Sequence, residues 1–179
     1  MREIDKSKPV LITGGSGYVA SWIIKMLLEE GINVNATVRD LSNSEKVDHL
    51  AELAKASAGE LKLFESDLLD IGSFDEPMRD CELVLHTASP FFITGIKDPE
   101  KELIRPAKEG TRNVLESARK NPTVKRVVLT SSVVAIYGDN ADIALTPAGV
   151  FTEKEWNMTS SAEHQPYAFS KTIAEKEAW

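Results

Sequence analysis

Tyr167 and Lys171 are the residues whose types and spacing most clearly suggest chemistry. On a helix, side chains four positions apart lie one turn apart on the same face. A free tyrosine has a pKa of about 10, and a neighbouring cation lowers that pKa by stabilising the phenolate. The pair therefore predicts a group that transfers a proton to or from a substrate oxygen near neutral pH.

A run of hydroxyl side chains at residues 130–132 offers a partner for this tyrosine. It closes the apolar segment 125–131, which is typical of a buried strand, and open α/β sheets bind ligands at the carboxyl ends of their strands. A serine there can hydrogen-bond the carbonyl oxygen that Tyr167 protonates. Ser132 and Ser131 are both candidates, because neighbouring strand residues point to opposite faces and the sequence does not give the register.

A glycine-rich loop, residues 13–20, joins the first predicted strand to the first predicted helix. Its glycines allow a tight turn and let the backbone approach a pyrophosphate, which the helix N-terminus then binds with free N–H groups and a positive dipole. Ala20 is small enough for the helix to pack closely on the strand. The strand before the loop and the helix after it distinguish a dinucleotide-binding loop from an ordinary turn.

The second predicted strand ends in Arg39-Asp40. An acidic residue at this point holds the ribose hydroxyls of NAD, whereas an arginine accommodates the 2′-phosphate of NADP. Arg39, with Lys46 as a second cation, favours NADP(H). Asp40 keeps NAD(H) as the alternative.

These residues need a scaffold of alternating strands and helices. Hydrophobic periodicity predicts strands over residues 9–13, 32–38, 60–64, 82–86 and 125–131, and helices over 18–30, 44–56, 74–78, 99–119 and a last segment through Tyr167 and Lys171. Gly31 suits the end of the first helix. The alternation predicts an α/β fold with a doubly wound parallel sheet, the Rossmann fold. Without a repeat or linker, we expect one domain over residues 1–179.

The composition narrows the class of protein and its partners. The 179 residues carry a net charge of −7, which argues against nucleic acid and anionic membranes as partners. No segment approaches the ~20 apolar residues of a membrane helix, and the charged N-terminus has no apolar signal-peptide core, so we expect a cytoplasmic protein. Cys81 is the only cysteine, which excludes an internal disulfide and a cysteine-rich metal site; we expect it in the core and predict no metal.

Many short motifs, in order along the whole chain, support a family assignment. They occupy residues 13–22, 36–40, 67–68, 72–76, 86–90, 97–100, 125–128 and 153–156. The sequence resembles the extended short-chain dehydrogenases/reductases, and within them the branch of dihydroflavonol reductases, cinnamoyl-CoA reductases and related microbial carbonyl reductases. The resemblance implies an NADPH-dependent oxidoreductase that reduces an aldehyde or ketone.

The resemblance also implies roles for individual residues. Ser132 would bind the substrate oxygen, Tyr167 would donate the proton, and Lys171 would bind the ribose and tune Tyr167. His86 would be a buried residue of the fourth strand rather than an acid or base. The expected cofactor contacts are Thr13, Gly14, Gly17, Tyr18, Val19, Arg39, Lys46, Asp67, Leu68, Thr87, Ala88, Ser89, Tyr167 and Lys171.

Departures from the family pattern limit the substrate. Tyr137 stands five residues past Ser132, where dihydroflavonol reductases carry an asparagine that grips the flavonoid. The stretch 164–171 lacks the aromatic and cysteine-containing signature of cinnamoyl-CoA reductases. A general reductase of small carbonyl compounds fits better. Family members continue well past this helix, so we expect the C-terminal substrate lobe to be missing from this chain, whose sequence stops within the catalytic helix.

Two other functions stay open. An NAD-dependent sugar-nucleotide epimerase/dehydratase or a steroid-type dehydrogenase would share the serine, tyrosine and lysine, although Arg39 and the segment around Trp156 argue against them. A non-catalytic NADP(H)-binding sensor of this fold would often lack the tyrosine or lysine, which are both present. The resemblance permits a monomer or a homodimer.

Overall fold

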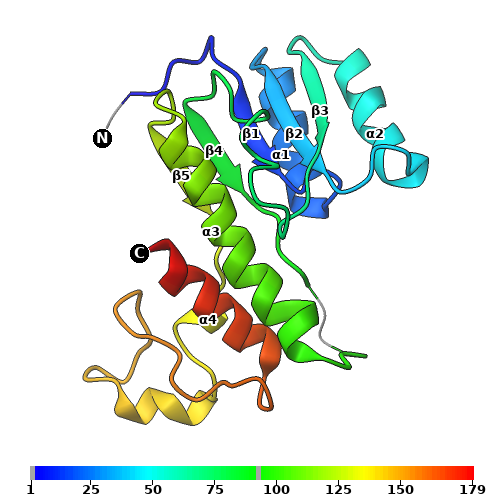
Figure 1. Cartoon of the computed structure of the whole chain (residues 1–179). Coiled ribbons are helices and arrows are strands. Elements are labelled where there is room, and N and C mark those ends of the chain that lie inside the picture. Colours follow the sequence, from blue (N-terminus) through cyan, green and yellow to red (C-terminus); the bar gives the residue numbers. More distant parts are fainter. Residues whose placement is uncertain (1–2, 92–93) are drawn as a thin grey trace. The chain divides into compact units, whose positions relative to one another are not determined.

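The computed structural model describes residues 3–91 and 94–179 (Figure 1). The chain forms two compact units: unit 1 comprises residues 1–88 and 113–130, and unit 2 comprises residues 89–112 and 131–179. Each unit contains two separate segments, so the division is not a boundary along the sequence. The single domain expected over residues 1–179 stays a prediction.

Unit 1 contains a parallel sheet of five strands in the order β3-β2-β1-β4-β5. The strands are β1 (Val10–Thr13), β2 (Val34–Val38), β3 (Leu61–Glu65), β4 (Leu83–His86) and β5 (Arg126–Leu129). The strand order reverses at β1, between β2 and β4, which is the switch point where doubly wound sheets bind nucleotides. The predicted parallel sheet is confirmed.

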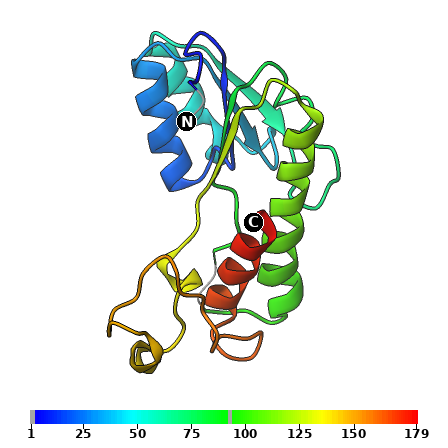
Figure 2. The same cartoon turned by 90° about the vertical axis from the view of Figure 1, so that its left-hand side faces the viewer.

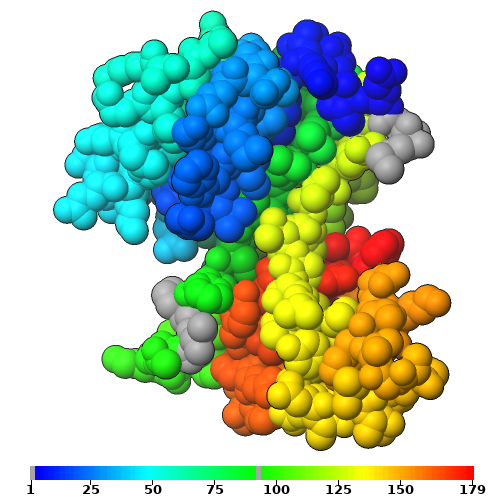
Figure 3. Space-filling model, turned by 180° about the vertical axis from the view of Figure 1, so that it is seen from behind, coloured from blue at the N-terminus to red at the C-terminus, as the bar shows by residue number. Residues whose placement is uncertain are grey.

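Helices cover both faces of this sheet because successive strand residues point to opposite sides. Val10 and Ile12 pack with α1 (Tyr18–Glu29) and α2 (Ser44–Lys55), whereas Leu11 packs with Val114 of α3 (Arg105–Lys120). Figure 2 shows α1 and the unit 1 part of α3 on opposite sides of the sheet. Seen from behind, α1 lies at the surface of its unit (Figure 3). The apolar residues on both faces of β1 and β2 are therefore buried.

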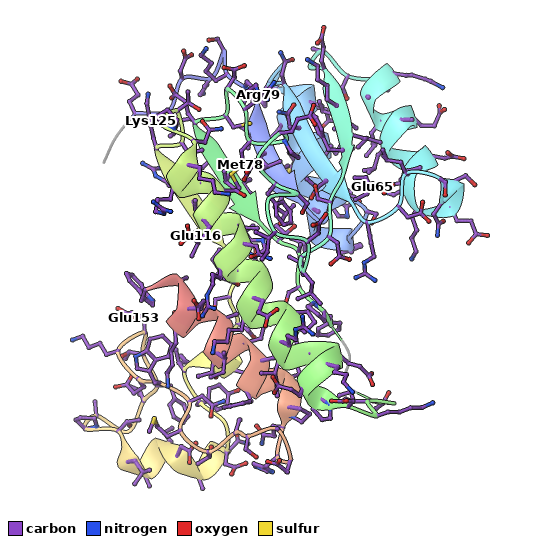
Figure 4. All side chains as sticks on the ribbon, viewed as in Figure 1. Glu65, Met78, Arg79, Glu116, Lys125 and Glu153 are labelled. Carbon is purple, nitrogen blue, oxygen red and sulfur yellow. The ribbon has the colours of Figure 1, made fainter. Side chains whose placement is uncertain are left out.

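The helix predicted over residues 74–78 is wrong. The segment is a series of turns, with one helical hydrogen bond from the Met78 N–H to the Phe74 carbonyl at 3.2 Å. Pro77 has no N–H to donate, and the left-handed residues Gly72 (φ 86°) and Asp80 (φ 65°) bound the segment. Phe74 and Met78 are nevertheless buried against the face that α3 covers, and Met78 is labelled in Figure 4.

Unit 2 contains short irregular helices and one regular one. A π-helix, η1 (Glu100–Ile104), precedes α3 where the sequence predicted one continuous α-helix. Pro106 explains the change, because its ring would clash with the carbonyl four residues earlier in a regular helix. The 3₁₀-helices η2 (Val133–Ala135) and η3 (Asn140–Leu145) follow, and α4 (Pro166–Ala178) closes the chain. Within the described residues, no helix has the length and apolar character to span a membrane.

Candidate nucleotide-binding and proton-transfer sites

The predicted site residues divide between the two units. Unit 1 contains Thr13, Gly14, Gly17, Tyr18, Val19, Arg39, Lys46, Asp67, Leu68, Thr87 and Ala88. Unit 2 contains Ser89, Ser132, Tyr167 and Lys171. Each group is described within its own unit.

The glycine loop follows β1 and leads directly into α1. Gly14 has a φ of 71°, and a Cβ there would lie 3.0 Å from the Ala88 Cα, so any side chain would be both strained and crowded. The Gly15 N–H donates to the Thr37 carbonyl at 2.7 Å, which ties the loop to β2. Gly17 is the extended N-cap residue of α1, whose first turn has no acidic side chain. The first N–H groups of α1 therefore form a positive helix end without a competing carboxylate.

Thr13 fixes the backbone on the other side of this loop. It is fully buried, and its hydroxyl accepts the N–H groups of Thr87 and Ala88, each at 3.1 Å. The Thr87 hydroxyl in turn donates to the Thr13 carbonyl. The same Thr13 oxygen lies 2.7 Å from Nδ1 of His86, which is buried as the sequence predicted. The carboxyl ends of β1 and β4 are thus held together at the switch point.

Arg39 and Asp40, at the end of β2, have different surroundings. Arg39 is exposed and has one ion pair among the described residues, in which its Nε lies 3.8 Å from Asp67 Oδ2. Asp40 accepts the N–H and the hydroxyl of Ser42 at 2.8 and 2.6 Å, and these hydrogen bonds hold its carboxyl pKa below the ordinary value. Lys46 is exposed in the first turn of α2. The carboxylate of Asp40 thus stabilises a local turn, while the guanidinium of Arg39 is exposed to solvent.

Asp67 and Leu68 follow β3. The Leu68 carbonyl accepts the Asn113 side chain at 2.7 Å, and Asp67 Oδ1 accepts the Leu69 N–H at 2.8 Å. These bonds fix the turn after β3 from the side of α3. Both residues therefore stand at a carboxyl strand end, as expected for residues that flank an adenine.

Ser89 begins unit 2 and has a buried hydroxyl oxygen. Within the described residues this oxygen has no hydrogen-bond partner. An unpaired buried hydroxyl costs about 1–3 kcal/mol in the absence of a ligand. Such a hydroxyl can accept a hydrogen bond from a bound molecule or donate one to it.

Tyr167 and Ser132 are brought together in unit 2. Tyr167 lies in the first turn of α4, and Ser132 is the N-cap residue of η2, in extended backbone just past the end of β5. The Ser132 hydroxyl is the neighbour that favours the ionised form of the Tyr167 phenol. The ring of Phe91 meets the Tyr167 ring edge-on, with the centroids 5.0 Å apart, and so covers one side of the phenol.

Lys171 lies one turn after Tyr167 on α4 and is buried. Burial lowers the pKa of its ammonium, and the nearby carboxylate of Glu175 acts in the opposite direction. Glu175 also accepts the hydroxyl of Ser131. The two adjacent serines therefore have different surroundings: Ser131 bonds Glu175, whereas Ser132 accepts the Val134 N–H at 3.4 Å and neighbours the Tyr167 phenol.

The sequence predicted that a neighbouring lysine lowers the pKa of Tyr167. Partial burial of the phenol instead raises this pKa, and the Ser132 hydroxyl acts in the opposite direction. Tyr167 is half-buried and Lys171 is buried, and loss of water disfavours the charged form of each side chain.

The sequence reasoning missed two neighbours of these groups. Glu175 is one helical turn after Lys171 and on the same face, so the spacing of acidic residues after the Tyr-Lys pair could have suggested it. Phe91 was not predicted to contact Tyr167, because nothing in the pattern of the sequence links a loop residue to a helix 76 positions later.

Comparison with known proteins identifies the family. The family model described as the NAD dependent epimerase/dehydratase family matches residues 10–179. The chain therefore belongs to this family. The predicted likeness to the dihydroflavonol reductase branch of the extended short-chain dehydrogenases/reductases is also confirmed by the relatives.

Three of these relatives illustrate the likeness. Cinnamoyl-CoA reductase CAD2 of Medicago truncatula is 45% identical over 174 residues, covering 95% of this chain and 52% of its own length. Dihydroflavonol 4-reductase of Gerbera hybrida is 39% identical over 177 residues, covering 99% and 48%. The crystal structure of yeast methylglyoxal/isovaleraldehyde reductase Gre2 complexed with NADPH is 33% identical, with a TM-score of 0.78, covering 96% and 52%. The chain thus spans about half the length of the relatives it matches.

Proposed function

We propose that the protein is an NADPH-dependent reductase of small aldehydes or ketones, with Tyr167 as the proton donor. The observation that carries the proposal is that the Ser132 hydroxyl neighbours the Tyr167 phenol, with buried Lys171 one turn further along α4. A hydroxyl, a phenol and an ammonium gathered at one helix are the groups that carbonyl reduction needs. The names of the relatives, which are reductases, support the same class of reaction.

The chain's own residues would handle the proton. The Ser132 hydroxyl would donate a hydrogen bond to the substrate carbonyl oxygen, and the Tyr167 phenol would pass its proton to that oxygen. Because burial raises the pKa of Tyr167, the phenol is protonated at neutral pH and ready to act as an acid. The Lys171 ammonium would stabilise the phenolate that remains. NADPH, when bound, supplies the hydride for the carbonyl carbon.

The residues of the glycine loop fit a dinucleotide. At Gly14 the backbone has a conformation and a space that exclude a Cβ, and the first turn of α1 carries no carboxylate. Thr13 holds the backbone of Thr87 and Ala88 at the next strand end. These features support pyrophosphate binding at the start of α1.

Arg39 supports NADPH over NADH. Its guanidinium is largely exposed, whereas the carboxylate of Asp40 is occupied by the backbone and hydroxyl of Ser42. A 2′-phosphate would gain a bidentate partner in Arg39. The similar yeast reductase is described as complexed with NADPH, which agrees with this choice.

The first test is a titration of this chain with NADPH and with NADH, followed by quenching of the fluorescence of its three tryptophans. We expect NADPH to bind at least tenfold more tightly. Tighter binding of NADH would overturn the cofactor assignment and favour an NAD-dependent epimerase/dehydratase. Binding of neither nucleotide would overturn the assignment of the glycine loop.

The second test addresses the chemistry. Tyr167→Phe is expected to reduce turnover of short aldehydes and ketones by about 10²- to 10⁴-fold, the usual contribution of general acid catalysis, while leaving NADPH affinity unchanged. Turnover retained in that variant would overturn the proposed role of Tyr167.

A further inference from the structure

Asn157 joins the two segments that carry Ser132 and Tyr167. It is only 5% exposed and lies in the irregular chain between η3 and α4. Its backbone N–H donates to the Ala135 carbonyl at 2.9 Å, and its side-chain Nδ2 donates to the Val134 carbonyl at 2.8 Å. Both acceptors belong to η2, which begins directly after Ser132. Asn157 therefore fixes the short helix that Ser132 caps.

The same side chain also holds the loop that leads into α4. Nδ2 donates to the Ser160 hydroxyl at 2.8 Å, and Oδ1 accepts the N–H groups of Thr159 and Ser160 at 3.2 and 3.0 Å. The Ser160 hydroxyl in turn donates to Gln165 Oε1 at 3.2 Å. Gln165 has a left-handed backbone (φ 58°) and is the N-cap residue of α4, two positions before Tyr167. A continuous series of hydrogen bonds thus runs from η2 to the start of α4.

A carboxamide is required at this position. An amide offers two N–H donors and an oxygen with two lone pairs, and Asn157 uses all four in this loop. The backbone packs tightly around it, because a Cβ at Gly138 would lie 2.7 Å from Asn157 Oδ1 and 2.3 Å from Thr159 Oγ1. The neighbouring Trp156 contacts α4 independently, with Lys176 Nζ 5.2 Å from its ring centroid.

We propose that Asn157 is a positioning residue that sets the distance between the Ser132 hydroxyl and the Tyr167 phenol. The proposal deepens the proposed function, because these are the groups assigned to proton transfer. Asn157 touches neither group directly: it acts on Ser132 through η2 and on Tyr167 through Ser160 and Gln165. Its loss would allow the two segments to separate while the α4 helix itself stays intact.

The test follows the ionisation of Tyr167 without substrate or cofactor. In a Tyr18→Phe, Tyr137→Phe background, Tyr167 is the only tyrosine, and tyrosinate absorbance reports its pKa directly. Asn157→Ala is expected to raise this pKa by about one unit, a tenfold change in the ionisation constant, since the Ser132 hydroxyl that favours the phenolate would move away from the phenol. Circular dichroism at each pH confirms that the chain stays folded.

The control is Asn35→Ala in the same background. Asn35 is a buried asparagine of β2 whose Nδ2 donates to the Pro77 carbonyl at 2.8 Å, so the variant loses a similar side chain from unit 1. It is expected to lower stability and leave the pKa of Tyr167 unchanged. An equal rise in both variants, or no rise in Asn157→Ala, would overturn the proposal.

If Asn157→Ala does not fold, a milder pair of variants tests the positioning role of Asn157. Ser160→Ala removes only the link from Asn157 to Gln165, whereas Ser161→Ala alters the adjacent hydroxyl, which bonds Glu163 and the His164 N–H instead. We expect a rise in the Tyr167 pKa for Ser160→Ala alone. The same pKa in both variants would contradict the proposal. Because the titration involves no turnover, it remains decisive even if the reductase assignment fails, which the Tyr167→Phe assay tests separately.

Discussion

The hydroxyl of Thr13 donates a hydrogen bond to Nδ1 of His86. Both lone pairs of that hydroxyl already accept N–H groups, those of Thr87 and Ala88, so its one hydrogen must point to the imidazole 2.7 Å away. Nδ1 is therefore the unprotonated nitrogen of His86. In this tautomer His86 has no proton to donate at Nδ1. Its hydrogen bond with Thr13 stabilises the strand ends, so the role of His86 is structural.

Thr13→Val tests this network. The substitution keeps the branched shape but removes the acceptor of two partly buried N–H groups and the donor to one imidazole nitrogen, so we expect a loss of about 3 kcal/mol in the free energy of unfolding. Thr13→Ser keeps the hydroxyl and should lose less than about 1 kcal/mol, chiefly for the missing methyl. Urea unfolding measures both. Equal losses in the two variants would show that the hydroxyl contributes little.

Gly14→Ala is expected to weaken nucleotide binding at least tenfold, and Gly31→Ala provides its control. Both glycines are left-handed, with φ of 71° and 74°, so each alanine should cost about 1–2 kcal/mol of stability. A Cβ at Gly31 has only Ala58 Cβ nearby, at 4.0 Å, whereas at Gly14 it would lie 3.0 Å from the Ala88 Cα. Fluorescence titration should therefore show NADPH affinity reduced at least tenfold in Gly14→Ala and unchanged in Gly31→Ala. A similar NADPH affinity in both variants would show that the glycine loop does not contact the cofactor.

Much of the fold could be predicted because its signals are local. Val10, Leu11 and Ile12 are consecutive and all buried, as expected for a strand covered on both faces, and Gly31 ends α1 with the predicted left-handed conformation. The segment at Phe74 and Met78 has helical spacing of apolar residues but is not a helix. The apolar pattern reflects only the burial of these two side chains. Pro77, which lies between them and has no N–H, prevents a regular helix.

Part of the site could also be predicted, because part of its signal is local in the sequence. The spacing of Tyr167 and Lys171 on one helix is a local property and is confirmed by α4. The distinction between Ser131 and Ser132 depends on the path of residues 133–165, which has no regular periodicity. Only the structure shows that Glu175 bonds the first serine while the second neighbours Tyr167.

Arg39→Ala separates the two nicotinamide cofactors. Removal of a charge-assisted contact to a 2′-phosphate should weaken NADPH binding by about 10- to 100-fold, whereas NADH, which lacks that phosphate, should bind with nearly unchanged affinity. The ion pair with Asp67 is exposed and is not expected to affect stability. Arg79→Ala, an arginine near the opposite, amino-terminal strand ends (Figure 4), serves as the control for net charge. An equal loss of affinity for NADPH and NADH would indicate that Arg39 contacts a part of the cofactor that the two molecules share.

Lys171→Met is expected to stabilise the chain at neutral pH and to impair turnover. Burial lowers the pKa of Lys171, so between that lowered value and the ordinary lysine pKa of about 10.4 the unfolded chain binds more protons than the native one, and native stability rises with pH. Methionine removes the cost of burying a charge, a gain of about 1 kcal/mol that should shrink as the pH approaches 10. Urea unfolding at several pH values below the raised pKa of Tyr167 measures the difference, because the phenol is then protonated in both proteins. Lys176→Met, on the same helix but exposed, is the matched control and should show little dependence on pH. A variant less stable than the parent at neutral pH, or a difference that does not change with pH, would mean that the Lys171 ammonium is stabilised by its surroundings rather than penalised by burial.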